Sequence, residues 1–188
     1  MLSSGVCTLF REYLLQNEFI EIHSPKLIAG SSEGGANVFT FSYFNRKACL
    51  AQSPQLYKQM CVMGDFQRVF EIGPVFRAEN SFTHRHMCEF VGLDLEMTIK
   101  EHYFEVLDFY ADFFPYIFNN LEKRFAKELK AINEQFEFTP FKCKTPVVRL
   151  TFEEGIKLLH EHGIECPVDD LSTETERKLG EIGTFRFI

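Results

Sequence analysis

Residues 69–97 of this 188-residue chain read VFEIGPVFRAENSFTHRHMCEFVGLDLEM, and this stretch decides the fold class. Polar and apolar side chains alternate over residues 69–77 and again over 90–97, which is typical of β-strands with one buried face. The polar segment 78–89 separates the two predicted strands. Because the chain shows no strand–helix–strand alternation, the sequence predicts an α+β domain in which helices flank an antiparallel sheet.

The alternation places a polar surface on the side of the sheet opposite the predicted core. The core face would carry Phe70, Ile72, Phe76, Val91, Leu93, Leu95 and Met97. The polar face would carry Glu71, Gly73, Val75, Arg77, Phe90, Gly92, Asp94 and Glu96. Glycine on a strand lets a ligand approach closely, an aromatic ring can stack on a base, and arginine can pair with a phosphate or a carboxylate. An ordinary solvated sheet face with one stray aromatic ring is the alternative interpretation.

The residues before this stretch predict a mixture of short elements. Apolar residues at helical spacing predict an amphipathic helix that ends at about residue 17. A short strand over 19–22, a glycine-rich loop over 30–37 and a hairpin over 38–51 are expected to follow. The loop lies between two strand-like runs, where loops often serve a site, although a simple linker has the same composition.

The residues after this stretch predict helices. A long helix is expected over 103–136, and Pro115 should kink it or split it in two. The sequences T-x-x-E at 151–154 and at 173–176 are capping boxes, and they predict two further helices.

A helix start at Ser53-Pro54 carries two side chains that suit an amino-acid ligand. Serine is a good N-cap and proline is preferred at the first helical position. Gln55 and Lys58 are three residues apart, so an amide and an ammonium group project on the same side. This pair would suit an amino-acid zwitterion with one extra negative group, and a plain surface helix start is the alternative.

Composition excludes several classes of protein. The chain is 45% hydrophobic, which is too apolar for a disordered tail, and no apolar run is long enough to span a membrane. The net charge of −7 argues against a small nucleic-acid module that binds by phosphate neutralisation alone. Its six cysteines are scattered without a C-x-x-C pair, which indicates a reducing compartment. The cluster of His84, His86 and Cys88 lacks a fourth ligand, so no metal site is predicted.

Several segments together resemble the catalytic domain of class II aminoacyl-tRNA synthetases, specifically the aspartyl type of the eukaryotic cytosol. Residues 9–28, with FIEIHSP at 19–25, resemble motif 1, and residues 69–97, with GPVFRAE at 73–79, resemble motif 2. SEGGANVF at 32–39 is similar to the loop that closes over the substrate, and AQSPQLYKQ at 51–59 to the amino-acid-binding segment. The resemblance extends to about residue 181, so residues 1–188 are interpreted as one partial catalytic domain.

The resemblance implies a role for individual residues. The aspartate-binding residues would be Glu33, Gln55, Lys58 and Asp94, with Lys58 on the substrate's side-chain carboxylate. The ATP-binding residues would be Arg77, Glu79, Arg85, His86, Met87 and Phe90, and Arg77 would also be catalytic through its contact with the α-phosphate. The acceptor end of tRNA would contact Asn80, Ser81 and Thr83. Mg²⁺ would bridge the ATP phosphates, with its protein ligands mainly in family segments outside this chain.

The implied function is that of a cytoplasmic, homodimeric aspartate–tRNA ligase, which dimerises through motif 1. It would activate L-aspartate with ATP and transfer the aspartyl group to tRNA(Asp). The glycine-rich third motif and the N-terminal anticodon-binding barrel of the family have no counterpart in residues 1–188, so we expect this polypeptide alone not to aminoacylate tRNA. A non-catalytic synthetase-like module for dimerisation or nucleotide binding is the alternative.

Overall fold

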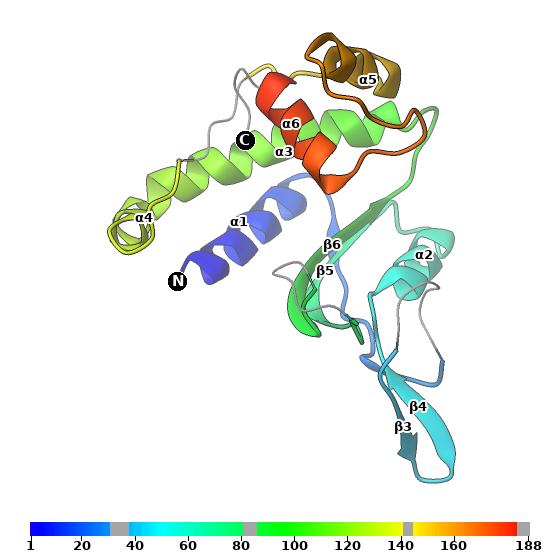
Figure 1. Cartoon of the computed structure of the whole chain (residues 1–188). Coiled ribbons are helices and arrows are strands. Elements are labelled where there is room, and N and C mark those ends of the chain that lie inside the picture. The colour runs from blue at the N-terminus through cyan, green and yellow to red at the C-terminus, as the bar shows by residue number, and fades with distance from the viewer. Residues whose placement is uncertain (31–37, 81–85, 141–144, 184–188) are drawn as a thin grey trace. The chain divides into compact units, whose positions relative to one another are not determined.

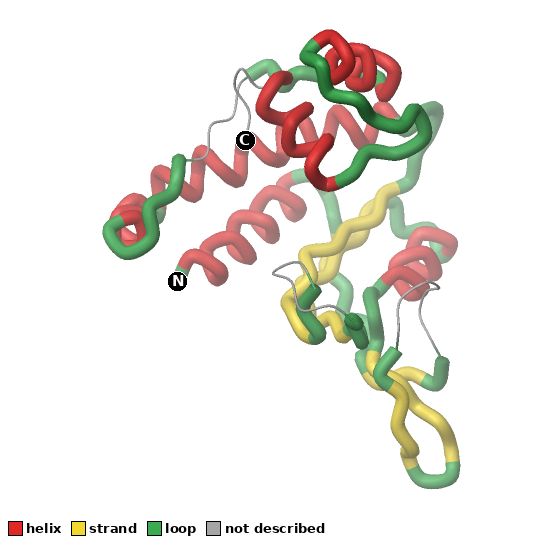
Figure 2. Tube along the Cα trace, in the orientation of Figure 1, coloured by secondary structure: helices red, strands yellow, loops and turns green. Residues whose placement is uncertain are grey.

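The computed structural model describes residues 1–30, 38–80, 86–140 and 145–183 (Figure 1). The chain divides into two compact units, one of Cys7–Val106 and the other of Met1–Val6 with Leu107–Ile188. Figure 2 shows that the strands belong to the first unit, whereas the described residues of the second form helices and loops. Antiparallel strands and helices together confirm the predicted α+β class. Among the described residues, no helix combines the length and apolar character needed to cross a membrane.

The central sheet of the first unit has the strand order β1-β5-β6. Strands β5 (Arg68–Phe76) and β6 (Glu89–Met97) are antiparallel over their full length, as predicted, with Gly73 opposite Gly92. Strand β1 (Ile20–Glu21) lies on the other side of β5 and runs parallel to it. This strand confirms the short strand predicted over 19–22, but its parallel pairing was not predicted, because its partner lies almost fifty residues further along the chain.

The core of this unit lies between helix α1 (Leu2–Gln16) and the central strand β5. Leu9 and Leu14 are fully buried, and the Phe10 ring packs edge-on against Phe70 at 5.9 Å between centroids. Burial of each such side chain contributes about 1.5–3 kcal/mol of transfer free energy. The helix therefore has the amphipathic face that its apolar spacing predicts.

The prediction that one face of β6 is buried in the core is wrong in part. Val91 and Leu93 are 59% and 39% exposed, although their alternation with polar residues predicts burial. These side chains are exposed because β6 lies at an edge of the sheet. Phe10 of helix α1 packs on Phe70 of the central strand β5 instead.

A second, smaller sheet has the order β2-β4-β3 and precedes helix α2. Its strands are β2 (Leu27–Ile28), β3 (Thr40–Tyr43) and β4 (Arg46–Leu50), and the last two form the predicted hairpin. Helix α2 (Gln55–Met63) begins one residue later than the Ser53-Pro54 pattern predicts. The Ser53 hydroxyl still accepts a hydrogen bond from the Gln55 N–H at 3.2 Å, which stabilises the helix start.

The long predicted helix is divided, but not at Pro115. Helix α3 (Phe104–Arg124) runs through Pro115, and the break lies at Phe125, before α4 (Ala126–Asn133). Phe125 has φ −121°, outside the helical region, and its ring occupies the space that a Cβ on Gly5 would need. The division therefore follows from the packing of an aromatic ring on a glycine, which helix propensity cannot reveal.

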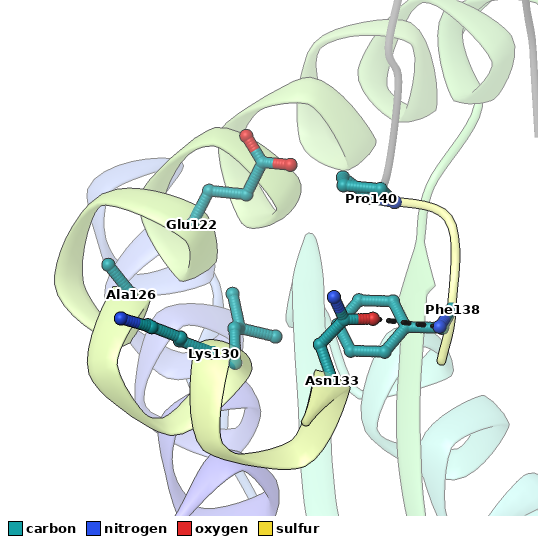
Figure 3. A pocket seen from close by; sticks show the side chains of 7 residues that line it. Glu122, Ala126, Lys130, Asn133, Phe138 and Pro140 are labelled. Carbon is teal, nitrogen blue, oxygen red and sulfur yellow. Dashed lines mark hydrogen bonds between the residues drawn. The ribbon is translucent and has the colours of Figure 1, made fainter. Parts of the chain in front are cut away.

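A pocket of about 320 Å³ lies beside α3 and α4, and Figure 3 shows its lining. Glu122 and Lys130 border it, and Phe138 and Pro140 form another wall. The Asn133 side-chain oxygen accepts a hydrogen bond from the Phe138 N–H at 2.8 Å. This bond fixes the direction in which the chain leaves α4.

The two predicted capping boxes have different outcomes. Helix α5 (Phe152–Glu161) has the complete box, in which the Glu154 N–H donates to the Thr151 hydroxyl and the Thr151 N–H to the Glu154 carboxylate. Helix α6 (Thr173–Gly183) begins differently, because the Ser172 hydroxyl accepts the first hydrogen bond, from the N–H of residue 175 at 3.2 Å. The residue that caps the start of α6 is therefore Ser172, one position before the predicted Thr173.

Candidate functional site

The polar face of the central sheet carries the residues that the strand alternation predicts. The register of β5 and β6 places three pairs of this face directly opposite one another: Glu71 and Asp94, Gly73 and Gly92, and Val75 and Phe90. Side chains opposite in an antiparallel pair lie within contact distance. Two carboxylates thus lie at one end of a strip of glycines, and an aromatic ring lies at the other.

Lys58 is the buried cation of this face. Its residue is only 4% exposed, and its ammonium group forms ion pairs with the carboxylates of Asp94 and Glu96, the latter at 3.2 Å. It also lies 3.5 Å from the main-chain oxygen of Leu95. A buried ammonium group is tolerated only when it is paired and hydrogen-bonded, so the two carboxylates of β6 hold Lys58 in place. Gln55 is half-buried one turn earlier on the same helix.

A second buried ion pair lies on the same face, and the sequence did not reveal it. Glu71 is 2% exposed and pairs with the ammonium group of Lys26. The same carboxylate accepts hydrogen bonds from the Ser24 N–H at 3.1 Å and from the Ser24 hydroxyl at 2.6 Å. The alternation placed Glu71 on the polar face, but its partners lie 45 and 47 residues away in sequence. The Ser24-Pro25-Lys26 segment is thereby attached to the sheet.

The two glycines of the strip are required by the protein's own packing. A Cβ on Gly73 would lie 2.9 Å from a carboxylate oxygen of Glu71, and a Cβ on Gly92 would lie 2.8 Å from a methyl group of Val75. A Cβ atom essentially never lies this close to another atom, so neither position accepts a larger residue without rearrangement. The glycines bring Lys26, Glu71 and Asp94 around one small hollow.

Arg77 and Phe90 lie together at the other end of the face. The guanidinium carbon of Arg77 is 5.6 Å from the centre of the Phe90 ring, within the range of a cation–π interaction. The Arg77 Nε lies 3.5 Å from the main-chain oxygen of Gln52, a residue with no exposed surface. The Arg77 main-chain N–H also donates to the main-chain oxygen of Cys88 at 2.9 Å, so the backbone hydrogen bonding between the two strands extends as far as Arg77.

The remaining predicted residues follow the strand ends. Glu79 is half-buried, whereas Asn80, His86 and Met87 are exposed. The predicted residues Glu33, Ser81, Thr83 and Arg85 lie outside the described part of the chain. In the ranges that the structure describes, no three histidine, cysteine, aspartate or glutamate side chains converge as they would around a metal ion.

In the part of the chain that the structure describes, this face carries as many negative as positive side chains. Glu71, Asp94 and Glu96 supply three carboxylates, and Lys26, Lys58 and Arg77 supply three cations. The two lysines are neutralised by their carboxylate partners, whereas Arg77 lies on an aromatic ring at the far end. Such an arrangement can accommodate an anionic group near either end while the strip between them stays close to the backbone.

Comparison with known proteins gives one consistent family. The family of tRNA synthetases class II (D, K and N) matches residues 1–186. The chain is 58% identical over 174 residues to aspartate–tRNA ligase 1, cytoplasmic, of Arabidopsis thaliana, covering 92% of this chain and 33% of that protein. It is 54% identical over 182 residues to the cytoplasmic aspartate–tRNA ligase of Homo sapiens, covering 96% and 36%. The chain thus spans about a third of the length of these relatives.

Solved structures agree with this assignment. The aspartyl-tRNA synthetase from Entamoeba histolytica superimposes with a TM-score of 0.80 at 47% identity, covering 97% of this chain and 34% of that one. An asparaginyl-tRNA synthetase from Pyrococcus horikoshii, complexed with asparaginyl-adenylate, gives a TM-score of 0.78 at 30% identity, covering 96% and 41%. Both the predicted resemblance and the predicted fold are confirmed, and the chain belongs to the class II tRNA synthetases of the D, K and N group.

Proposed function

We propose that this chain provides the aspartate- and ATP-binding residues of an aspartate–tRNA ligase. The observation that carries the proposal is the buried Lys58 ammonium group, held by Asp94 and Glu96 on the same sheet face as the Arg77–Phe90 pair. A fixed cation at one end suits a substrate carboxylate, and a cation on an aromatic ring at the other suits a nucleotide. Relatives named cytoplasmic aspartate–tRNA ligases, at 54–58% identity, support the same substrate and a cytoplasmic location.

In the proposed aspartate subsite, Lys58 pairs with the side-chain carboxylate of the substrate. An ammonium group has three donors, and the contact with the Leu95 oxygen is the longest of those that Lys58 makes. The substrate carboxylate would replace this contact, while the two carboxylates of β6 keep the ammonium group in position. Gln55 and Glu33 would hold the α-amino group. A neutral asparagine side chain would gain less from this cation, which favours aspartate.

In the proposed ATP subsite, Arg77 contacts the α-phosphate and Phe90 stacks on the adenine ring. The guanidinium group already covers one face of the Phe90 ring, so the base would use the other face or displace the arginine. Glu79 and Met87 would contact the adenine edge, and His86 and Arg85 the terminal phosphates. Asn80, Ser81 and Thr83 would meet the acceptor end of tRNA(Asp). Mg²⁺ would enter with the ATP phosphates and neutralise part of their charge.

The proposed reaction has two steps and needs no enzyme nucleophile. The α-carboxylate of aspartate attacks the α-phosphorus of ATP, and the bond to pyrophosphate breaks, which gives aspartyl-adenylate. The terminal hydroxyl of tRNA then attacks the activated carbonyl and releases AMP. Positioning and neutralisation of phosphate charge by Arg77 account for the acceleration.

The proposed partner in assembly is a second copy of the chain, bound through motif 1. Apolar side chains in residues 9–28 remain accessible, and Leu15, Ile20 and Leu27 are 46–53% exposed. Accessible apolar groups of this kind are typical of surfaces that become buried in a dimer.

Calorimetric titration of the 188-residue chain with ATP and with L-aspartate tests the proposed function. Lys58→Met should weaken aspartate binding about tenfold or more and leave ATP affinity within about twofold, and Arg77→Met should do the reverse. Lys157→Met, which removes a lysine that is 78% exposed, is the matched control and should change neither. Absence of binding at millimolar concentrations, or equal effects of Lys58→Met and Lys157→Met, would contradict the proposal.

A further inference from the structure

A thiol and an imidazole meet at the end of helix α5, far along the chain from the residues of the sheet face. The Cys166 sulfur lies 3.7 Å from Nε2 of His160, within the distance of a hydrogen bond to sulfur. Cys166 is half-buried and His160 is exposed. In the sequence, Cys166 is one of six scattered cysteines, and its position six residues after His160 is no recognised spacing.

The contact follows from how α5 ends. Gly163 has φ +72°, a left-handed conformation that glycine adopts without steric cost. The Gly163 N–H donates to the His160 oxygen at 2.9 Å, and the Ile164 N–H donates to the Leu159 oxygen at 3.0 Å. These two bonds are the Schellman motif, which reverses the chain over the last helical turn. The reversal returns residues 164–166 to the side of His160, so backbone geometry holds the pair together.

The pair is accessible to a small molecule. It lies in the wall of a hollow formed by His160, Gly163, Ile164, Glu165 and Cys166. The exposed carboxylate of Glu165 and the carbonyl end of α5 both favour a positive charge at this place. The same negative surroundings favour a reagent that carries positive charge.

We propose that Cys166 is a site of thiol–disulfide exchange with small cationic disulfides, and that His160 assists as the proton acceptor. The thiol proton passes to Nε2 of His160, and the Cys166 thiolate attacks one sulfur of the disulfide reagent. A new S–S bond forms at Cys166 while the S–S bond of the reagent breaks. The leaving thiolate takes the proton from the imidazolium. Cys166 is oxidised, and one half of the reagent is reduced to a thiol.

Exposure and imidazole assistance predict opposite orders of reactivity. Cys88 is exposed, whereas Cys166 is only half-buried, so reaction governed by access alone would modify Cys88 first. Cys49 is buried, and its sulfur lies 3.5 Å from the main-chain oxygen of Ile28, so it should react most slowly. Assistance by His160 would instead make Cys166 the fastest of the three.

The experiment follows the modification of each cysteine in the whole chain by cystamine, using acid quenching and peptide mass spectrometry. Cys166 should react about fivefold or more faster than Cys88 near neutral pH. His160→Gln should remove this advantage and leave the Cys88 rate unchanged. His162→Gln, a neighbouring histidine whose ring contacts the Leu158 oxygen, is the matched control and should keep the advantage. A faster Cys88, or an unchanged Cys166 rate in His160→Gln, would overturn the proposal.

A second measurement on the unsubstituted chain avoids any effect of substitution on folding. Cystamine and 3,3′-dithiodipropionate are disulfides of similar size that carry opposite charges. For each disulfide, the rate at Cys166 is divided by the rate at which the same disulfide reacts with 2-mercaptoethanol. The normalised rate should be about threefold or more higher for cystamine, because the Glu165 carboxylate and the carbonyl end of α5 attract its positive charge. Equal normalised rates, or a preference for the anionic reagent, would refute the proposed selectivity.

Discussion

Replacement of Glu71 by glutamine is expected to destabilise the unit of Cys7–Val106 by about 2–3 kcal/mol. Three donors point at this carboxylate: the Lys26 ammonium group and the N–H and hydroxyl of Ser24. Removal of one partner from a fully buried pair costs about 3–5 kcal/mol, because the other charge is left without compensation. The Glu71 side chain is 3% exposed, but that of Lys26 is 22% exposed, so water partly hydrates the remaining cation. The expected loss of about 2–3 kcal/mol therefore lies at or just below the lower limit for a fully buried pair.

The assay is hydrogen exchange of the β5 amides, which reports on the unit that contains the pair. Glu71→Gln, Lys26→Met and the double variant form a thermodynamic cycle, and a coupling energy of about 1–3 kcal/mol is expected between the two residues. Glu161→Gln is the control, because its partner Lys157 is 3.9 Å away and 78% exposed, and its effect should fall within the error of measurement. A coupling energy near zero, or equal effects of Glu71→Gln and Glu161→Gln, would refute the reasoning from burial.

Gly73→Ala should lower the urea midpoint markedly, since its Cβ would lie 2.9 Å from a fixed carboxylate oxygen, whereas Gly30→Ala, with nothing within 4 Å, should not. Arg11 holds the pKa of Glu21 below its ordinary value near 4.5 through hydrogen bonds of 2.8 and 2.9 Å, so their pair stabilises the fold above that pH. Glu21→Gln should therefore lower the free energy of unfolding by at most about 1 kcal/mol at pH 7, since the Arg11 side chain is 42% exposed. In urea unfolding at lower pH, the variant and the parent should become equally stable as the pH falls through the lowered pKa of Glu21. Thr151→Ala should lower helix content near α5 and cost about 1 kcal/mol in the same unfolding assay, and an unchanged midpoint would contradict the importance of the cap.

Local pattern was sufficient for much of the fold and for part of the site. Alternation over residues 69–77 and 90–97 predicted both strands and the side of the sheet on which Arg77 and Asp94 lie, because strand geometry has a period of two. It failed for Val91, where alternation reports which face a side chain takes but not whether another element covers it. The position of the helix break also escaped prediction, since Phe125, at the break, packs on Gly5, which lies far away in sequence.

The sequence by itself determined the family, the paired strands and the residue types of the site, because these depend on order and spacing along the chain. Only the tertiary structure decided the partners of the charged groups: Lys58 with Asp94 and Glu96, and Lys26 with Glu71. These pairs join residues 36 to 45 positions apart, and no local rule relates them. They form because the fold brings each charge into a place with little water, where only an opposite charge at contact distance makes its burial tolerable.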